Sequence, residues 1–244
     1  MDALALEIQA RLDNVNEKIA LAAQYSGRKF EDVRLVVVTK AQPIEVVQAA
    51  VEAGARILGE NYPEESIAKI EAVGGVNGVE WHMIGHLQSR KASLVADHFT
   101  MMHSLDSLRL AERLNRRLVE TGKKMPVMLE FNVAGEASKG GWDAAPGADW
   151  NNWRPDIEQI LAMPNLVIKG VMCMPPLFDE PELTRPFFVQ ARKVLDFLSN
   201  HFPDLGDWNE MSMGTSADFE VAIQEGATYV RIGTAIVGAR PKRG

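Results

Sequence analysis

SMGTS (residues 212–216) and RIGTA (231–235) each place hydroxyl side chains and a glycine directly after a short apolar run. The two apolar runs that precede these stretches are the seventh and eighth of eight predicted strands. In (β/α)8 barrels, phosphate is frequently bound by the loops that follow the seventh and eighth strands. The position of the two stretches therefore favours an α/β fold with a single (β/α)8 TIM barrel over a doubly wound open sheet, which is the competing fold.

Short β-branched runs alternate with longer segments of helical periodicity throughout the chain. The strands are predicted near residues 34–39, 56–60, 80–85, 99–104, 125–133, 166–173, 208–213 and 228–232. The helices that follow them are predicted at residues 44–53, 63–73, 88–96, 106–121, 152–162, 183–200, 216–225 and 234–239. An additional amphipathic helix over residues 2–25 precedes the first strand. No linker interrupts the units, so we expect one domain over residues 1–244.

The composition is that of an ordinary globular protein. The chain has 244 residues, of which 46% are apolar and 24% charged, with a formal net charge of −7. This charge gives no basic surface for nucleic acid or anionic lipid. Cys173 is the only cysteine, so no internal disulfide can form, which suits a reducing cytoplasm. No stretch resembles a signal peptide or approaches the roughly 20 apolar residues of a membrane span. We therefore expect a cytoplasmic protein without nucleic-acid or membrane partners.

Lys40 ends the apolar run LVVVTK (35–40), at the point where the first strand opens into its loop. A lysine at a strand end could simply be solvated. Its amine is also a nucleophile for an aldehyde, provided that burial or neighbouring cations favour the neutral form, since the usual pKa is about 10.4. The active sites of such barrels lie at the carboxyl ends of the strands, where Lys40 would be.

The two loops form a candidate anion cradle, made of Ser212, Gly214 and Thr215 after the seventh strand and Gly233 and Thr234 after the eighth. Backbone N–H groups at helix starts bind anions, although plain helix N-caps would use the same residue types. Two such starts aimed at one point suit a phosphate dianion better than two unrelated caps. Together with an aldehyde-reactive lysine, they predict a site for pyridoxal 5'-phosphate (PLP).

Arg231 lies two residues before Gly233 and therefore points to the same face of the eighth strand. A buried arginine there needs an acceptor, which could be a carboxylate inside the barrel or the pyridine nitrogen of PLP. Because arginine is not deprotonated in proteins, the second arrangement would keep that nitrogen unprotonated and weaken the ring as an electron sink.

Several longer motifs resemble one known family. They are GENY (59–62), WHMIGHLQ (81–88), HSLD (103–106), EASKG (136–140), SMG (212–214) and RIGTAIVGAR (231–240). In this order, over about residues 35 to 240, they resemble the YggS/PROSC-like pyridoxal phosphate homeostasis proteins. The resemblance implies a fold-type III barrel similar to the N-terminal domain of alanine racemase. It also implies that PLP is held as a Schiff base on the lysine that ends the first strand, here Lys40.

The same resemblance implies roles for the other candidate residues. The phosphate ligands would be Ser212, Gly214, Thr215, Gly233 and Thr234, Arg231 would face the pyridine nitrogen, and Asn61 would lie beside the ring. The chain departs from the family pattern locally, at AQP (41–43) and at Pro63. Segment 141–154, which carries three tryptophans, looks longer than the family pattern and could form a lid or a packing insert.

His82 and His86 are four residues apart, a spacing at which two histidines on a helix can bind one metal ion. The surrounding WHMIG (81–85) is typical of a strand instead, no glutamate follows His82, and no third ligand is apparent. We therefore expect structural hydrogen bonding by these residues and no metal site.

The function we expect is that of a PLP-binding protein which buffers the cofactor and hands it on, without robust turnover. In racemases with this barrel type, a further β domain supplies the opposing tyrosine base. The present sequence ends at Gly244, just beyond the predicted barrel, so we expect no such domain. PLP-dependent apoenzymes are the candidate recipients of the cofactor, and the expected state is a monomer.

Two enzymatic alternatives remain open. An amino-acid racemase-like PLP enzyme would need a second acid–base group opposite Lys40, for which His82, His86 and Tyr62 are the candidates. A phosphate-sugar barrel enzyme could use Lys40 as a Schiff-base lysine without a cofactor and keep the same phosphate loops. The family motifs argue against this last interpretation.

Overall fold

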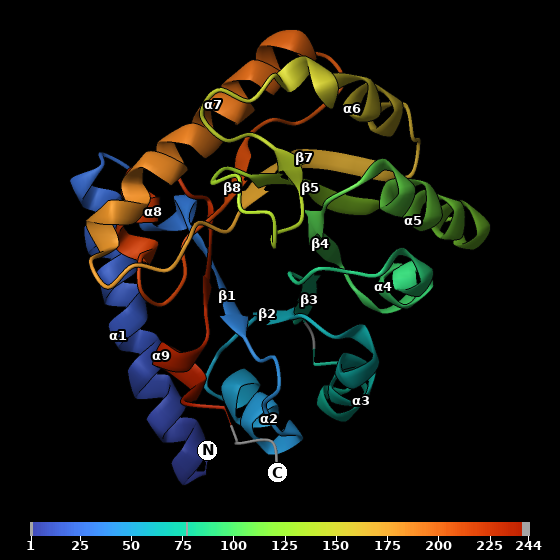
Figure 1. Ribbon diagram of the computed structural model, residues 1–244. Coiled ribbons are helices and arrows are strands. Elements are labelled where there is room, and N and C mark those ends of the chain that lie inside the picture. Colours follow the sequence, from blue (N-terminus) through green and yellow to red (C-terminus); the bar gives the residue numbers. More distant parts are fainter. Residues whose placement is uncertain (1, 77, 241–244) are drawn as a thin grey trace.

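The computed structural model describes residues 2–76 and 78–240, and its centre is a closed barrel of eight parallel strands (Figure 1). In chain order the barrel strands are β1 (Arg34–Val38), β2 (Ile57–Glu60), β3 (Glu80–Met83), β4 (Met101–Leu105), β5 (Met125–Asn132), β7 (Leu166–Cys173), β8 (Glu210–Ser212) and β9 (Tyr229–Ile232). Pairing of β1 with β9 and of β4 with β5 closes the ring. The predicted barrel and its eight strands are confirmed. The predicted domain end at residue 244 lies outside the described residues.

Helices surround the barrel, one after each of its strands (Figure 1). They are α2 (Ile44–Glu52), α3 (Pro63–Val73), α4 (Ala92–His98), α5 (Leu108–Thr121), α6 (Arg154–Leu161), α7 (Arg185–His201), α8 (Phe219–Gln224) and α9 (Thr234–Val237), preceded by α1 (Ala3–Tyr25). The 3-10 turns are η1 (Phe30–Asp32), η2 (Ser89–Lys91), η3 (Trp150–Asn152) and η4 (Pro181–Thr184). Each predicted helix is present. The start of α8 is later than predicted, because a turn over residues 215–218 precedes it.

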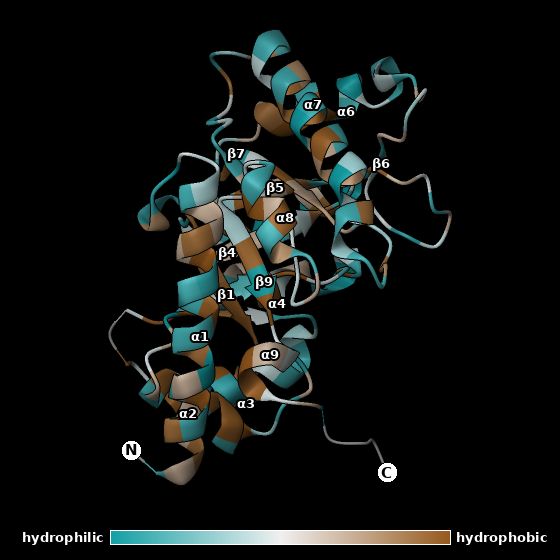
Figure 2. Cartoon of the chain, turned by 90° about the vertical axis from the view of Figure 1, so that its left-hand side faces the viewer, coloured by the Kyte–Doolittle hydropathy of each residue, from teal (hydrophilic) through white to brown (hydrophobic). Residues whose placement is uncertain are grey.

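The N-terminal helix α1 packs an apolar stripe against other helices of the outer layer. Asp2 caps the helix, since its carboxylate accepts a hydrogen bond from the backbone N–H of Ala5 at 2.8 Å. Buried Ile8, Leu12 and Val15 recur at steps of three and four. The helix contacts α2, α8 and α9, so it joins the first βα unit to the last two. Figure 2 shows the alternation of hydrophilic and hydrophobic residues along α1 and α7.

Side chains inside the barrel form a hydrophobic cluster of their own, which consists of Val36, Val38, Ile84, Met101, Met128, Met172 and Tyr229. Because alternate residues of a strand share a face, Lys40 follows Val36 and Val38 on the inward face of β1. For the same reason Arg231 and Gly233 follow Tyr229 on the inward face of β9. The parallel register places Val36 opposite Arg231. Lys40 and the loop after β9 therefore meet at the carboxyl end of the barrel.

Segment 141–154 packs against the barrel. Within it, β6 (Trp142–Asp143) pairs with the end of β5, where Trp142 lies opposite Phe131. The Phe131 ring contacts Trp142 and Trp153, with centroid separations of 5.8 and 5.0 Å. Trp153 Nε1 donates to the carbonyl of Asp143 at 2.9 Å. Of the two interpretations offered by the sequence, these contacts support the packing insert. The sequence did not predict β6, because two residues are too few to show a strand pattern.

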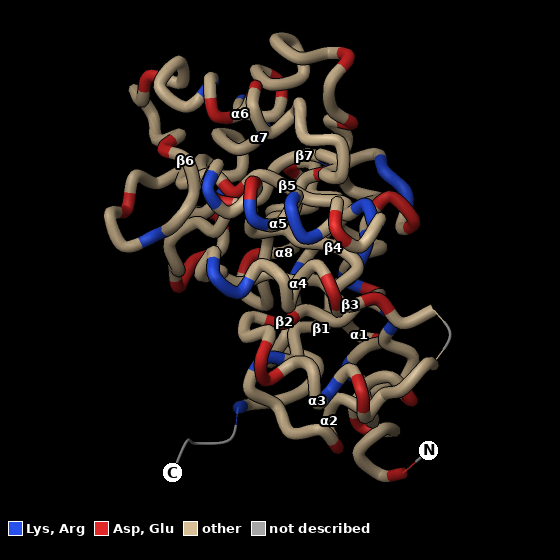
Figure 3. Tube along the Cα trace, turned by 90° about the vertical axis from the view of Figure 1, so that its right-hand side faces the viewer, with Lys and Arg blue, Asp and Glu red and all other residues tan. Residues whose placement is uncertain are grey.

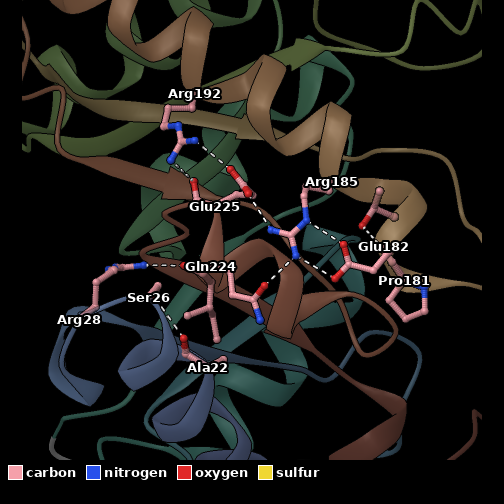
Figure 4. Close-up of polar contacts among 11 residues, drawn as sticks. Ala22, Ser26, Arg28, Pro181, Glu182, Arg185, Arg192, Gln224 and Glu225 are labelled. Carbon is pink, nitrogen blue, oxygen red and sulfur yellow. Dashed lines mark hydrogen bonds and ion pairs between the residues drawn. The ribbon is translucent and has the colours of Figure 1, made fainter.

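A network of arginines and carboxylates fixes the segment that follows β7 against α8 (Figure 4). Arg185 donates to Glu182, Glu225 and Gln224 at 2.7 Å each. Arg192 also donates to Glu225, at 2.9 Å. An exposed ion pair alone contributes little to stability. Here two arginines share one buried carboxylate, so the network holds η4 and the first turns of α7 in place.

Charges of both signs are interspersed along α5 in the view of Figure 3. The sequence as a whole has 26 Lys and Arg against 33 Asp and Glu, so acidic groups are in excess. Among residues 2–76 and 78–240, none of the helices combines the length and the apolar character that crossing a bilayer requires.

Candidate functional site

A cavity of about 380 Å³ opens at the carboxyl end of the barrel, a size within the range of small-molecule sites. Its walls come from the end of β1 and from the loops after β2, β7, β8 and β9. Six of the eight residues predicted for the site line it, namely Lys40, Asn61, Thr215, Arg231, Gly233 and Thr234. The other two, Ser212 and Gly214, do not.

Lys40 is half-buried in a tight turn at the cavity wall. The turn is closed by a hydrogen bond of 3.1 Å from the Gln42 N–H to the Thr39 carbonyl, and Ala41 within it has a φ of 55°. Burial lowers the pKa of the Lys40 amine, and the positive charges of Arg240 and Arg231 lower it further. The sequence argument required burial or neighbouring cations at this lysine, and the structure has both.

A buried polar network fixes the backbone just before Lys40. Lys69 Nζ donates to Glu60 Oε1 at 2.7 Å and to the carbonyl of Thr39 at 2.8 Å. The Thr39 hydroxyl donates to the same Glu60 oxygen at 2.7 Å. Sequence reasoning missed this network. The available signal was Lys69, which shares the inner face of α3 with Ser66 and Val73, where an apolar residue is expected.

Asn61 presents an unsatisfied acceptor near the cavity. Its Oδ1 is buried and has no hydrogen-bond partner among the described residues. The side chain fits there only because Gly85 has none, since a Cβ on Gly85 would lie 2.6 Å from Asn61 Cγ. A buried acceptor without a donor costs roughly 1–3 kcal/mol. A ligand that donates to Asn61 would recover this free energy.

The loop after β8 differs in detail from the predicted cradle. The backbone N–H and the hydroxyl of Thr215 both donate to Asp218 Oδ1, at 2.6 and 2.9 Å, so this hydroxyl closes a turn. Its neighbour Ser216 lines the cavity, and its Oγ accepts a hydrogen bond of 3.3 Å from the N–H of Gly233. Ser216 therefore joins the loops after β8 and β9. It lies within the stretch SMGTS, but sequence reasoning did not single it out.

Ser212 and Gly214 are not among the residues that line the cavity, so their predicted role as direct phosphate ligands stays a prediction. Ser212 is fully buried, and its Oγ is hydrogen-bonded to Arg231 and to His103 at 2.6 and 2.7 Å. Gly214 has a φ of 91°, and a Cβ there would lie 2.6 Å from the Cβ of Ala222. Glycine is needed at 214 because the chain turns and packs closely against α8.

Arg231 is buried at the cavity floor with its guanidinium held by three hydrogen bonds. Nη1 donates to Ser212 Oγ at 2.6 Å, and Nη2 donates to the carbonyl of Cys173 at 3.0 Å and to Sδ of Met174 at 2.8 Å. None of these partners is a carboxylate, so the predicted alternative of a salt bridge inside the barrel is not what the described residues form. A guanidinium has five N–H donors, and the three bonds leave Nε–H and one Nη1–H for other acceptors.

Glu130 is a partly buried residue with a buried carboxyl oxygen, and sequence reasoning missed it. It follows Met128 on the inward face of β5, and its Oε2 has no hydrogen-bond partner among the described residues. Burial raises the pKa of Glu130 to about 7, the negative charge of Asp106 adds to this, and the charge of Arg231 opposes it. A single acidic residue in the apolar strand MLEFN (128–132) was the available signal.

His82 and His86 lie in different surroundings. His82 is fully buried inside the barrel, with Nδ1 2.9 Å from Nε2 of His103. The His86 side chain is 68% exposed, and its Nδ1 lies 2.7 Å from Asp106 Oδ2. Both histidines therefore make hydrogen bonds to protein groups, as predicted, and they do not converge on one point.

Comparisons with known proteins agree with this arrangement. The profile of the family described as "Alanine racemase, N-terminal domain" matches residues 10–241. The chain is similar to the pyridoxal phosphate homeostasis protein of Vibrio alginolyticus, at 36% identity over 236 residues, which are 96% of this chain and 97% of the relative. Its similarity to the protein of the same name from Escherichia coli strain K12 is 37% identity over 242 residues, with coverage of 96% and 97%.

Solved structures of similar proteins have the same fold. PipY of Synechococcus elongatus, with PLP bound, matches with a TM-score of 0.81 and 32% identity over 95% of this chain and all of that chain. An alanine racemase of Clostridium difficile in complex with cycloserine matches with a TM-score of 0.73 and 16% identity, over 97% of this chain and 60% of the racemase. At this identity the likeness to the racemase shows the fold alone.

Proposed function

This chain belongs to the pyridoxal phosphate homeostasis proteins, a family with the alanine racemase N-terminal domain, and from this premise we propose that it binds PLP and takes part in PLP homeostasis. The observation that carries the proposal is Lys40. Its half-buried amine has a lowered pKa and faces the same cavity as Arg231 and the loops after β8 and β9. A lysine in these surroundings is suited to react with an aldehyde.

Three features of the cavity fit PLP chemically. The two unused N–H donors of Arg231 suit an acceptor such as an unprotonated ring nitrogen. The unsatisfied Oδ1 of Asn61 suits a donor on the ligand. The meeting of the loops after β8 and β9 at Ser216 and Gly233 provides hydroxyl and backbone N–H groups for a phosphate.

We assign roles on this basis. The phosphate would lie against Ser216, Gly233 and Thr234, with the Thr215 turn behind them, Arg231 would donate to the ring nitrogen, and Asn61 would lie beside the ring. When bound, PLP would supply an aldehyde with which the Lys40 amine could form a Schiff base with loss of water, and a ring whose strength as an electron sink depends on protonation of its nitrogen.

We further propose that the chain buffers PLP and transfers it to apoenzymes without robust turnover, as a one-domain monomer. Arg231 can only donate hydrogen bonds, so it disfavours a protonated ring nitrogen and the carbanion chemistry that such a nitrogen supports. The names of the relatives, which describe homeostasis and no reaction, support this proposal.

A racemase-like activity is the second candidate, and Glu130 is the observation that favours it. This carboxyl lies on the inward face of the barrel near Arg231 and exchanges its proton near neutral pH, as an acid–base group must. The test is deuterium exchange at the α-carbon of L-amino acids incubated with PLP-loaded protein. Exchange with racemisation at ordinary enzyme rates, about 1–10³ s⁻¹, would replace the carrier by the racemase. Slow exchange without racemisation supports the carrier.

The binding proposal is tested by the absorption spectrum and by chemical trapping. The protein incubated with PLP should become yellow, and borohydride reduction followed by mass spectrometry should place a phosphopyridoxyl group on Lys40. Lys40→Ala should lose the trapped adduct, whereas the control Lys169→Ala, at a partly exposed lysine outside the cavity lining, should keep it. An adduct on another lysine, with Lys40 unmodified, would overturn the assignment.

A further inference from the structure

A continuous chain of hydrogen-bonded side chains crosses the barrel interior beneath the cavity. It joins Arg231 Nη1 to Ser212 Oγ at 2.6 Å, Ser212 Oγ to His103 Nδ1 at 2.7 Å, and His103 Nε2 to His82 Nδ1 at 2.9 Å. His82 Nε2 then lies 3.1 Å from Glu80 Oε2. The five residues belong to β3, β4, β8 and β9, so the chain connects opposite walls of the barrel.

The middle of the chain is closed to solvent, and only its two ends reach the cavity and the surface. Ser212, His103 and His82 are fully buried, whereas the Glu80 side chain is 56% exposed at the amino end of β3. The ring of Tyr229 packs against both histidines, with centroid separations of 5.9 and 5.0 Å. The guanidinium of Arg34 lies over the Tyr229 ring, with Cζ 4.0 Å from the ring centroid, and forms an ion pair with Glu210. The chain therefore extends from the cavity floor to the opposite end of the barrel.

The two ends determine the direction of each hydrogen bond. Arg231 has only donors, so Ser212 Oγ accepts a hydrogen bond from it and donates its own hydrogen bond to Nδ1 of His103. Burial lowers the pKa of His103 and of His82, which keeps both rings neutral. Each neutral ring then donates from Nε2, first to His82 and finally to Glu80. The bond from His82 lowers the pKa of Glu80, which stays an ionised acceptor.

We propose that Ser212, His103 and His82 are positioning residues for Arg231, which hold its guanidinium through a one-way chain of hydrogen bonds that ends on Glu80. Held in this way, Arg231 keeps its remaining donors for the cavity. The acceptor they meet is the ring nitrogen of PLP, and in this respect the inference rests on the proposed function. The hydroxyl proton of Ser212 is committed to His103, so Ser212 acts through Arg231 and does not contact the phosphate.

The direction of the chain can be measured without cofactor. Nitrogen-15 NMR of the histidine rings at neutral pH should show His82 and His103 uncharged, each with its proton on Nε2. Ser212→Ala should change the His103 signals, because Nδ1 loses its donor. A proton on Nδ1 of either ring, or a positively charged ring, would overturn the one-way chain.

The positioning role is tested by comparing the binding of PLP with that of pyridoxal, which lacks the phosphate. Ser212→Ala should weaken both ligands by the same factor, about tenfold, because the affected group faces the ring. The control Ser104→Ala removes one buried hydrogen bond outside the chain, from its hydroxyl to the carbonyl of Gly85 at 2.7 Å, and should leave both affinities unchanged. Weakening of PLP alone in Ser212→Ala, or no weakening, would refute the role.

A second pair of variants acts from the far end, where a substitution cannot touch the ligand. Glu80→Ala removes the terminal acceptor, so we expect both His82 tautomers in the NMR spectrum. We also expect a two- to threefold loss of affinity for PLP and pyridoxal, which corresponds to a few tenths of a kcal/mol. Glu80→Gln keeps an acceptor oxygen and should restore wild-type behaviour. If Glu80→Ala behaved as the wild type in both measurements, the chain would not extend to Glu80. If the unsubstituted protein bound neither PLP nor pyridoxal, the proposed function would be wrong. The NMR measurement would still show whether the one-way chain of hydrogen bonds exists.

Discussion

Replacing Glu130 with glutamine should remove one defined contribution to the pH dependence of stability between about pH 5 and 8. Burial raises the pKa of this carboxyl in the folded protein to about 7, against 4.5 as its ordinary value. The folded state therefore binds the proton more tightly than the unfolded chain. Stability from this group is fully present below about pH 4.5 and is lost as the pH rises to about 7 and beyond.

The size of the effect follows from that difference. One pH unit between the two pKa values corresponds to about 1.4 kcal/mol, so Glu130 should make the protein about 2–3 kcal/mol less stable at pH 8 than at pH 5. Glutamine resembles the protonated carboxyl in shape and cannot ionise. The variant should accordingly fold, and its stability should lack this contribution to the slope.

The assay is urea unfolding of the cofactor-free protein at pH 5 and pH 8. Between these pH values the free energy of unfolding should fall by about 2–3 kcal/mol more for the wild type than for Glu130→Gln. Glu158→Gln, at a surface carboxylate 3.5 Å from Arg154, is the matched control and should follow the wild type. An equal slope in wild type and Glu130→Gln would show that Glu130 is ionised throughout and would refute the reasoning from burial.

Three further predictions concern the site and its support. Ser216→Ala should weaken PLP by roughly 1.5–3 kcal/mol and leave pyridoxal almost unaffected in a titration followed by absorbance, and equal weakening of both would exclude Ser216 as a phosphate ligand. Lys69→Met should leave the carboxylate of Glu60 buried without its cation and cost about 3–5 kcal/mol in urea unfolding, whereas the partly exposed Lys91→Met should cost about 1 kcal/mol or less. Gly214→Ala should cost about 2–4 kcal/mol, because its Cβ would lie 2.6 Å from the Cβ of Ala222. Gly147→Ala is the control, because Gly147 has a φ of 88° and a Cβ there would have no atom within 4 Å, so this variant measures backbone strain alone. An equal loss of stability in both variants would contradict a steric overlap at residue 214.

The sequence alone predicted the barrel and the position of Lys40. Buried parallel strands read as short apolar runs, and the eight runs are separated by segments of helical period, so each element could be recognised from its own residues. The place of Lys40 at the end of β1, and of the two hydroxyl–glycine loops after β8 and β9, followed from the same local pattern. Their meeting at one cavity followed from the parallel direction of the strands.

Tertiary structure alone decided which residues of those loops face the cavity. Sequence reasoning singled out Ser212, Gly214 and Thr215, whereas the residues of this loop that line the cavity are Thr215, Ser216 and Ala217, which follow a turn at Gly214 with a φ of 91°. A single backbone angle in a loop reverses the direction of the next side chains, and no periodicity constrains it.

The buried polar contacts were likewise beyond the sequence. Ser212 meets His103 from 109 residues away, and Lys69 meets the carbonyl of Thr39 from 30 residues away. Glu130 has a raised pKa mainly because neighbouring strands remove it from water, with the charge of Asp106 adding to the rise. Secondary structure is determined by each residue's near neighbours along the chain, but hydrogen-bond partners and desolvation depend on residues that only the closed barrel brings together.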